Sequence, residues 1–287
     1  MGAPDTLFVR QYENTITLLA QQMDTYLKNT VMVDTNFKAE KKFYEQYNAD
    51  SFTEISARYA DTQNGLPDHR RRMVTPRFFT SSTLEDPIDA LQQLVDPKGT
   101  YYQAKLAGAN RQIDDVIISS YVATAYTGKD GTTSQSFTSA NQISSGSTGM
   151  TKAKLIKARR LLDKAEVERA DRFCVHGSSQ LDDLLNTTEI ANSDYNVVKA
   201  LVQAEVDTWL GFKFVRTERL LTNGSSERLC YLYQKRGYQL AIQQDVTGRI
   251  DERPDKNYAW QVYMKIALGA TRLEEARCVE MACVEAA

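Results

Sequence analysis

The stretch YYQAKLAGANRQIDDVIISSYVATAY, residues 101–126, decides the fold because it predicts one unusually long helix. Its apolar residues recur at steps of three and four, so they share one helical face. They are Tyr102, Leu106, Ala109, Ile113, Val116, Ile117 and Tyr121. Asp96 and Pro97 supply a start signal, and Gly128 follows the end. About thirty residues would span roughly 45 Å, so the helix is long enough to cross a domain.

Upstream of this helix, two regions differ in periodicity. A helix is predicted from Thr6 to Leu27, with an apolar stripe that needs a partner. The stripe consists of Phe8, Tyr12, Ile16, Leu19, Met23 and Leu27. From Thr30 to Thr83 the chain is polar, with short extended pieces such as Met73-Val74, and it indicates a long β-rich excursion. So little apolar content predicts that the excursion is ordered by contact with something else, for example a neighbouring subunit.

Downstream of the long helix, residues 127–149 are rich in Ser, Thr and Gly and predict a flexible loop. The chain then alternates helix and strand, which is typical of a layered α/β domain. We expect helices at 151–166, 181–185 and 197–210, and strands at 172–176, 212–215, 229–233 and 240–243. Gly211 is expected to end the third of these helices. Closing strands are expected at 258–264 and 278–284, around an amphipathic segment at 266–276. A short helix is also expected to start at Asp86-Pro87.

Bulk composition argues against several classes of protein. The chain has 35 basic and 37 acidic side chains, a net charge of −2, so no positive field favours dedicated DNA binding. Its four cysteines are dispersed and lack zinc-ligand spacing, so we expect free thiols in a reducing cytoplasm and no metal. No apolar run approaches the roughly 18 residues of a membrane span. No nucleotide or cofactor motif occurs, so no cofactor is expected.

Two pairs of residues carry side chains of types that enzymes use in catalysis. Asp114 and Asp115 are adjacent on the long helix, where their side chains point about 100° apart, so a structural role is expected. Cys174 and His176 alternate on a predicted strand and share a face, which leaves a thiol enzyme as an alternative. A cysteine in a strand is more often a small buried hydrophobe, so no catalytic residue is assigned.

The densest positive cluster is His69-Arg70-Arg71-Arg72 with Arg77, within the polar excursion. Three interpretations stay open, namely ion pairing between subunits, a solvated turn and contact with nucleic acid. The rigid fork of arginine suits registry between subunits through carboxylates. Possible partners are Glu45, Asp50, Glu54 and Asp61, or acids on the long helix. The contact candidates between subunits are Phe8, Tyr12, Arg70, Arg71, Arg72 and Arg77.

Several local sequences, in order along the chain, resemble the major capsid proteins of tailed bacteriophages. They are EISARYADT (54–62), RRRMVTPRFF (70–79), DPIDALQQLVDP (86–97), RQIDDVII (111–118), TAYTGKDG (124–131), SDYNVVKALVQAEVDTWLGFKFVRTERL (193–220), ERPDKNYAWQVY (252–263) and GATRLEEARCVEM (269–281). The resemblance spans nearly the whole chain. It implies an α+β fold with an N-terminal arm, an extended β-hairpin loop, a peripheral domain with a long spine helix, and an axial α/β domain.

The resemblance also implies a division of the chain and a function. Residues 1–28 would be the arm, 29–85 the extended loop over an adjacent subunit, 86–150 the peripheral domain with its spine helix and flexible loop, 151–245 the axial domain, and 246–287 the closing strands of the peripheral domain. The chain would be a structural protein that self-assembles into pentamers and hexamers. These would form the icosahedral shell of a virion around double-stranded DNA.

The implied setting includes other partners. Assembly would take place in the cytoplasm of a host bacterium, with portal, scaffolding or decoration proteins and with DNA enclosed non-specifically. A shell of a cellular nanocompartment with the same fold is an alternative. Some members of the family join a lysine of the extended loop to an asparagine of a neighbour. Lys38, Lys41 and Lys42 lie in that loop, but no partner is evident and no cross-link is expected.

Overall fold

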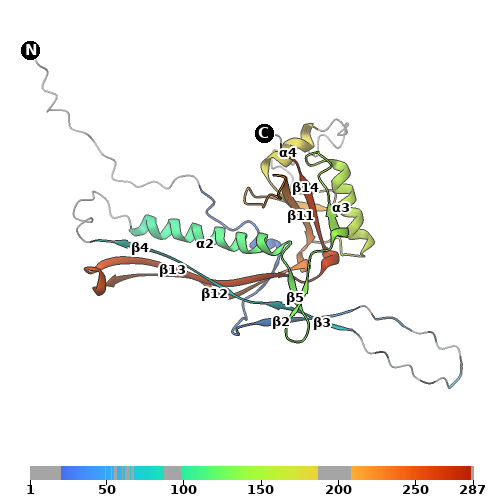
Figure 1. Ribbon diagram of the computed structural model, residues 1–287, viewed down its shortest axis with the longest axis horizontal. Helices are drawn as coiled ribbons and strands as arrows, with labels where there is room; N and C mark the ends of the chain where they lie inside the picture. The colour runs from blue at the N-terminus through green and yellow to red at the C-terminus, as the bar shows by residue number, and fades with distance from the viewer. Residues whose placement is uncertain are drawn as a thin grey trace, which may run out of the picture. The chain divides into compact units, whose positions relative to one another are not determined.

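The computed structural model describes residues 21–48, 50–52, 54, 57–59, 61, 65, 68–86, 98–186 and 208–285 (Figure 1). The chain divides into two compact units that interleave in sequence. The first comprises Met1–Asp24, Phe78–Arg111 and Asp245–Ile266, and the second comprises Thr25–Arg77, Gln112–Gln244 and Ala267–Ala287. Four elements, α2, β4, β12 and β13, run from one unit into the other.

The elements are of mixed α+β type, as expected. The helices are α2 (Lys98–Ser120), α3 (Lys152–Lys164) and α4 (Ser178–Asn186), with short 3-10 turns η2 (Lys28–Thr30), η3 (Ser139–Asn141), η4 (Lys235–Gly237), η5 (Pro254–Lys256) and η6 (Glu275–Arg277). The strands are β1 (Met32–Asp34), β2 (Lys42–Tyr47), β3 (His69–Val74), β4 (Arg77–Glu85), β5 (Ala125–Thr127), β6 (Thr133–Gln135), β7 (Gln142–Ile143), β8 (Arg172–His176), β9 (Thr208–Trp209), β10 (Phe212–Arg216), β11 (Arg228–Gln234), β12 (Tyr238–Arg253), β13 (Ala259–Arg272) and β14 (Cys278–Cys283).

The long helix is confirmed as α2, but it ends at Ser120 and not near Tyr126. Its 23 residues correspond to about 35 Å. The end is set by Tyr121, whose ring is fully buried and whose carbonyl accepts hydrogen bonds from Tyr238 Oη and Arg272 Nη1 instead of continuing the helix. The chain then enters β5 at Ala125.

The expected N-terminal helix is only partly testable, since residues 6–20 lie outside the described part of the chain. Residues 21–27 are not helical, so the expected helical end at Leu27 is wrong. The reason is a competing partner, because the buried carboxylate of Asp114 accepts the backbone N–H groups of Tyr26 at 3.0 Å and Leu27 at 3.2 Å. The short helix expected to start at Asp86-Pro87 falls on residues 87–97, which lie outside the described part of the chain.

The first sheet has the strand order β1-β12-β13-β4. Its strand β13 continues to Arg272, so the amphipathic segment expected at 266–276 is wrong. Val262, Met264 and Ile266 are buried while the residues between them are more exposed, which is the alternation of a strand with one covered face.

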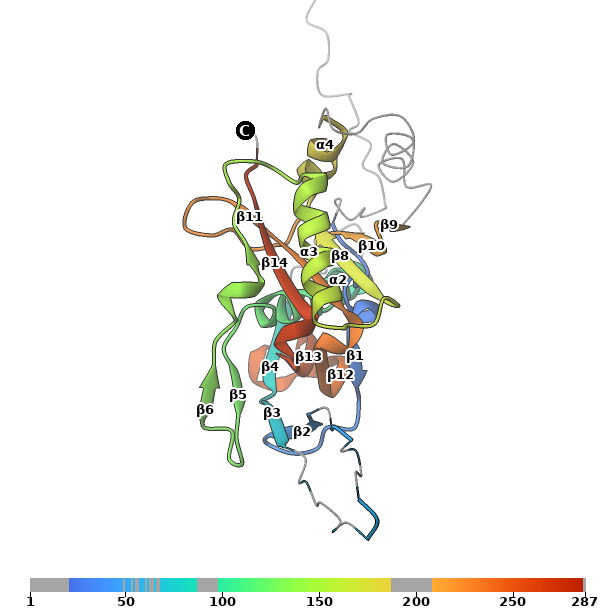
Figure 2. The same ribbon diagram turned by 90° about the vertical axis from the view of Figure 1, so that its right-hand side faces the viewer.

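The second sheet has the order β7-β14-β11-β8-β10-β9 and is covered by α3 (Figure 2). Leu155, Ala158 and Leu162 of α3 are fully buried, and Lys154 Nζ donates to the carbonyl of Ala282 in β14 at 3.1 Å. The layered α/β arrangement is therefore confirmed. Strand β14, however, pairs antiparallel with β11 and so lies in the sheet expected for residues 151–245, not with the closing strands of the peripheral domain.

One expected loop and the end of one expected helix are corrected by short strands. Residues 127–149 are not a flexible loop, since they hold β6, η3 and β7, and β7 pairs parallel with β14. Residues 208–209 form β9, so the helix expected over 197–210 does not reach Gly211; its residues 197–207 lie outside the described chain. Leu210 and Gly211, both with positive φ, form the two-residue turn between β9 and β10.

The third sheet has the order β2-β3-β5-β6 and contains the expected β-hairpin. Strands β2 and β3 pair antiparallel from Lys42 opposite Val74 to Tyr47 opposite His69. Strand β5 pairs with β3 at Arg72 and Met73, so the polar excursion is joined to the segment that follows α2.

Gly269 in β13 tests the packing beside this hairpin. A Cβ there would lie 2.5 Å from the Thr75 carbonyl oxygen, so backbone would have to move. We expect Gly269→Ala to lower the free energy of unfolding by roughly 1–3 kcal/mol. Gly224→Ala is the matched control, because nothing lies within 4 Å of its Cβ position. Urea denaturation measures both variants, and equal stabilities would contradict this packing.

Candidate assembly surface on the extended hairpin

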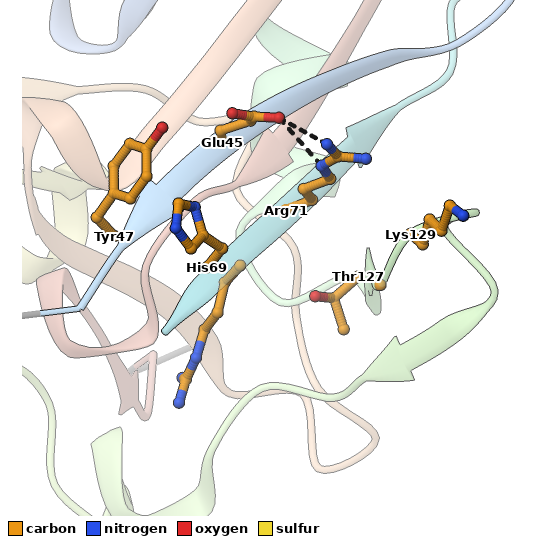
Figure 3. A pocket seen from close by; sticks show the side chains of 8 residues that line it. Glu45, Tyr47, His69, Arg71, Thr127 and Lys129 are labelled. Atoms are coloured by element: carbon orange, nitrogen blue, oxygen red, sulfur yellow. Dashed lines mark hydrogen bonds and ion pairs between the residues drawn. The ribbon is translucent and has the colours of Figure 1, made fainter. Parts of the chain in front are cut away.

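The outward face of the β2–β3 hairpin brings together groups from three strands and one turn (Figure 3). Glu45 lies directly opposite Arg71, and Tyr47 directly opposite His69, so all four side chains share one face. Arg71 donates to Glu45 Oε1 from Nη2 at 2.8 Å and from Nε at 3.1 Å. The pair is about half exposed, so it stabilises the hairpin modestly.

The same face forms a hollow with the turn after β5. The rings of Tyr47 and His69 meet edge to face with centroids 4.6 Å apart. Thr127 and Lys129 line the hollow beside Arg71 (Figure 3). The hollow therefore offers cations and an aromatic pair to a partner with carboxylates.

The four candidate arginines do not act as one cluster. Arg70 is exposed and pairs with Asp68 at 3.2 Å. Arg77 donates from Nη2 to Ser119 Oγ at 3.1 Å. Arg71 is held by Glu45, which is one of the partners considered from the sequence, although the pair is within one chain. Alternation along β3 turns the Arg71 side chain to the face opposite that of Arg70 and Arg72.

Arg72 points into its own subunit, so its candidacy as a contact between subunits is wrong. Its side chain is 6% exposed, Nε donates to the Leu273 carbonyl at 2.8 Å, and Nη2 lies 3.7 Å from Glu275 Oε1. Burial lowers the pKa of Arg72, while Glu275 favours its charged form. Arg72 thus anchors the hairpin to the segment after β13.

The root of the hairpin carries a second polar cluster. The Asp34 carboxylate pairs with the Lys42 ammonium and accepts a hydrogen bond from Tyr44 Oη at 2.7 Å. Burial alone would raise the pKa of Asp34, but these hydrogen bonds outweigh it and lower the pKa. Lys42 also donates to the Asn36 carbonyl at 2.8 Å, so its amine is held within its own chain. The absence of a cross-link stays a prediction.

The remaining candidates lie elsewhere in the chain. Phe8 and Tyr12 lie outside the described residues. Asp114 and Asp115 diverge as expected, since Asp114 binds backbone amides while Asp115 accepts from Arg219 Nε at 2.6 Å. Cys174 and His176 are almost completely buried, and burial raises the pKa of the Cys174 thiol and lowers that of His176. A buried neutral thiol gives the enzyme alternative no support.

Within the described residues, no group of three or more His, Cys, Asp and Glu side chains is placed to hold a metal ion. No helix in the same part of the chain is long and apolar enough to cross a membrane.

The sequence had not indicated two exposed aromatic residues between β2 and β3, Phe52 and Tyr59, as contact candidates. The sequence feature that could have identified them is that they are aromatic residues in a segment with too few apolar neighbours to bury them.

Comparisons with known proteins agree with this geometry. The profile of a family described as phage capsid protein matches residues 5–285. The capsid asymmetric unit of Cyanophage Pam1 has a TM-score of 0.76 at 12% sequence identity, over 99% of this chain and 98% of that chain. The capsid of Cyanophage P-SCSP1u gives 0.75 at 13%, covering 98% and 94%, and that of Ralstonia phage GP4 gives 0.75 at 9%, covering 99% and 97%. No curated protein sequence matches the chain.

The arrangement of helices and sheets is the tailed-phage capsid-protein fold. The chain belongs to the phage capsid protein family, which confirms the resemblance seen in its sequence. It is a major capsid protein of the phage head shell, and its location is the capsid of the virion.

Neighbouring arginines on β3 provide a test of this site. Arg72→Ala removes one partner of a buried charge network, so we expect a loss of about 3 kcal/mol in the free energy of unfolding. Arg71→Ala removes an exposed pair and should cost at most about 1 kcal/mol. Urea denaturation of the two variants measures the difference. Equal losses would contradict the opposite orientations of these side chains.

Proposed function

We propose that copies of this chain assemble as pentamers and hexamers into an icosahedral shell that encloses double-stranded DNA. The observation that carries the proposal is the match to the phage capsid family over residues 5–285. That match also favours a phage head over a nanocompartment with the same fold. The proposal extends to assembly in the host cytoplasm and to portal, scaffolding or decoration proteins as partners.

The hairpin provides the physical support. Phe52 and Tyr59 are fully exposed in the described chain, and burying one such side chain contributes roughly 1.5–3 kcal/mol. A contact of this size is weak in a single pair of subunits. Repetition around a closed shell makes it sufficient, because each subunit is held by several neighbours at once.

The proposed domains are those expected from the sequence, except for the assignment of strand β14. Residues 1–28 form the arm, 29–85 the extended loop, 86–150 the peripheral domain and 151–245 the axial domain. Strand β14 is assigned to the axial sheet because it pairs with β11. The proposed contacts between subunits are Phe8, Tyr12, Arg70, Arg71 and Arg77, with Arg72 left out because of its burial.

Assembly of the chain alone is the direct test. We expect the soluble protein to elute in size-exclusion chromatography as large species, and negative-stain electron microscopy to show shells, capsomers, tubes or sheets. A monodisperse monomer or dimer, persistent at high concentration and with any scaffolding protein supplied, would overturn the proposal.

Charge reversal at Arg71 tests whether it contacts a neighbouring subunit. We expect Arg71→Glu to leave the subunit folded, since an exposed pair contributes at most about 1 kcal/mol. Shell yield, measured by sedimentation and microscopy, should fall by about tenfold or more, which is the effect of roughly 1.4 kcal/mol per contact. Lys157→Glu, an exposed reversal on α3, is the control and should assemble normally.

The double variant Glu45→Arg/Arg71→Glu separates two roles of Arg71. It restores the ion pair within the hairpin, but the positive and negative charges that a neighbouring subunit meets have exchanged places. We expect it to stay defective in assembly. Full rescue would mean that Arg71 acts only within its own hairpin.

A further inference from the structure

A second hollow lies within the second unit, where α3, β8 and the β9–β10 turn come together (Figure 2). We call it the α3 hollow. Its volume is about 320 Å³, at the lower end of the ~300–1,000 Å³ that is usual for small-molecule sites. Four charged side chains and the two residues of a tight turn line it. They are Arg159 and Asp163 of α3, Arg169 of the loop that follows, Arg172 of β8, and Leu210 and Gly211.

One of the three arginines is fixed in the wall of the α3 hollow. The Arg172 side chain is only 2% exposed, and its Nη1 lies 2.8 Å from Asp163 Oδ1. Its Nε donates to the Glu168 carbonyl at 3.0 Å, and its Nη2 donates to the Val167 carbonyl at 2.6 Å. Because each of its nitrogens has a partner, Arg172 holds Asp163 in place and adds a positive charge to the hollow.

The other two arginines have donors available for a ligand. Arg159 Nε lies 3.8 Å from Asp163 Oδ2, and Arg169 Nε lies 3.9 Å from Asp163 Oδ1. These distances are too long for hydrogen bonds. The two side chains are 47% and 86% exposed, and each guanidinium carries five N–H groups. Two guanidiniums therefore line the hollow without a close partner among the described residues.

The α3 hollow has an excess of positive charge. Three arginines, which stay protonated at any ordinary pH, surround one carboxylate, so two positive charges are uncompensated. The macrodipole of α3 places about half a negative charge near its last turn, which reduces this excess without cancelling it. Two acids nearby in sequence are paired with other residues. Glu168 pairs with Arg236 at 3.0 Å, and Asp171 pairs with Lys213 at 3.1 Å.

The exposed side of α3 extends the positive region. Lys157, Arg160 and Lys164 are exposed there and form no ion pair with any described residue. Glu166, just beyond the helix, is exposed but does not line the hollow. Cations gathered on one surface draw anions toward it and raise their local concentration.

We propose that the α3 hollow binds a doubly charged phosphate group, held by Arg159 and Arg169. A phosphate of this kind carries about −1.5 to −2 charges at pH 7 and three acceptor oxygens, so it neutralises the excess and accepts from both guanidiniums. A carboxylate carries one charge and would leave half of the excess. The ligand is free phosphate or the terminal phosphate of a nucleotide. The site lies on one chain and does not depend on the proposed shell function.

Isothermal titration calorimetry of the full chain with inorganic phosphate measures the binding directly. We expect one site per chain, and binding of acetate that is weaker by about tenfold or more at the same pH and ionic strength. Arg169→Ala should weaken phosphate binding by about tenfold, since hydrogen bonds to a charged group are lost. Acetate bound as tightly as phosphate would overturn the proposal in favour of a receptor for acidic side chains.

Arg160→Ala is the matched control. It removes the same charge from the exposed side of α3, but Arg160 does not line the hollow. Salt screens such a charge, so phosphate binding should weaken by no more than about twofold. Arg159→Ala should instead behave like Arg169→Ala. Equal losses in Arg160→Ala and Arg169→Ala would overturn the discrete site in favour of a diffuse positive field.

Thermal unfolding separates ligand binding from folding. Because Arg169 is 86% exposed, Arg169→Ala should unfold at the temperature of the unaltered chain when phosphate is absent. Phosphate should raise the unfolding temperature of the unaltered chain more than that of the variant, since a ligand that binds the folded state stabilises it. An equal rise in both would reflect only the general effect of phosphate salts on folded proteins and would overturn the site.

Competition distinguishes the sources of the phosphate group. Displacement of inorganic phosphate by a nucleoside monophosphate, but not by the unphosphorylated nucleoside, would support a nucleotide ligand. Binding of inorganic phosphate alone would support free phosphate. Duplex DNA with 5′-hydroxyl ends offers only singly charged phosphates and should compete weakly. Equal competition by DNA with and without terminal phosphates would overturn the doubly charged ligand in favour of the nucleic-acid backbone.

Discussion

The second unit depends on one buried side chain, Tyr121, which follows the last residue of α2. Its ring packs against Tyr231, Tyr233 and Tyr238 at centroid distances of 4.4, 5.2 and 4.8 Å. Its hydroxyl shares a hydrogen bond with Tyr233 Oη at 2.9 Å, and its carbonyl accepts from Arg272, which is itself fully buried. Strands β11, β12 and β13, which follow α2 only much later in the sequence, thus meet the end of this helix. Burial raises the pKa of Tyr121, so this contact stays neutral and insensitive to ordinary pH.

The parts of the fold that could be predicted from the sequence are those with a clear local apolar pattern. Helix α3 was predicted nearly to the residue because its apolar period is strong, and strand β8 because it is a short run that is buried along its whole length. Strands β6 and β7 were missed because both lie at sheet edges, where pairing depends on backbone and the Ser and Thr side chains give no apolar alternation. The position of β14 was also missed. Its partner β11 lies some fifty residues away, and local periodicity contains no information on such pairing.

The candidate site shows the same limit at the level of single residues. A cluster of arginines was visible in the sequence, and Glu45 was among the partners considered. The division of that cluster required the register of β3, which turns Arg71 outward and Arg72 inward. Registers are set by pairing between strands, so a run of like charges alone does not reveal which members are available to a partner. The exposure of Phe52 and Tyr59 could likewise be recognised only once the structure showed which residues surround them.

The position of β14 has a consequence for synthesis of the protein. This strand is the last in chain order among the described elements, yet it lies between β7 and β11 inside the six-stranded sheet. A nascent chain that has not yet produced it would leave the edges of both neighbours unpaired and the apolar side of α3 uncovered. Completion of the sheet therefore waits for translation to pass this point. Ribosomes that stop early would release fragments in which this sheet cannot close.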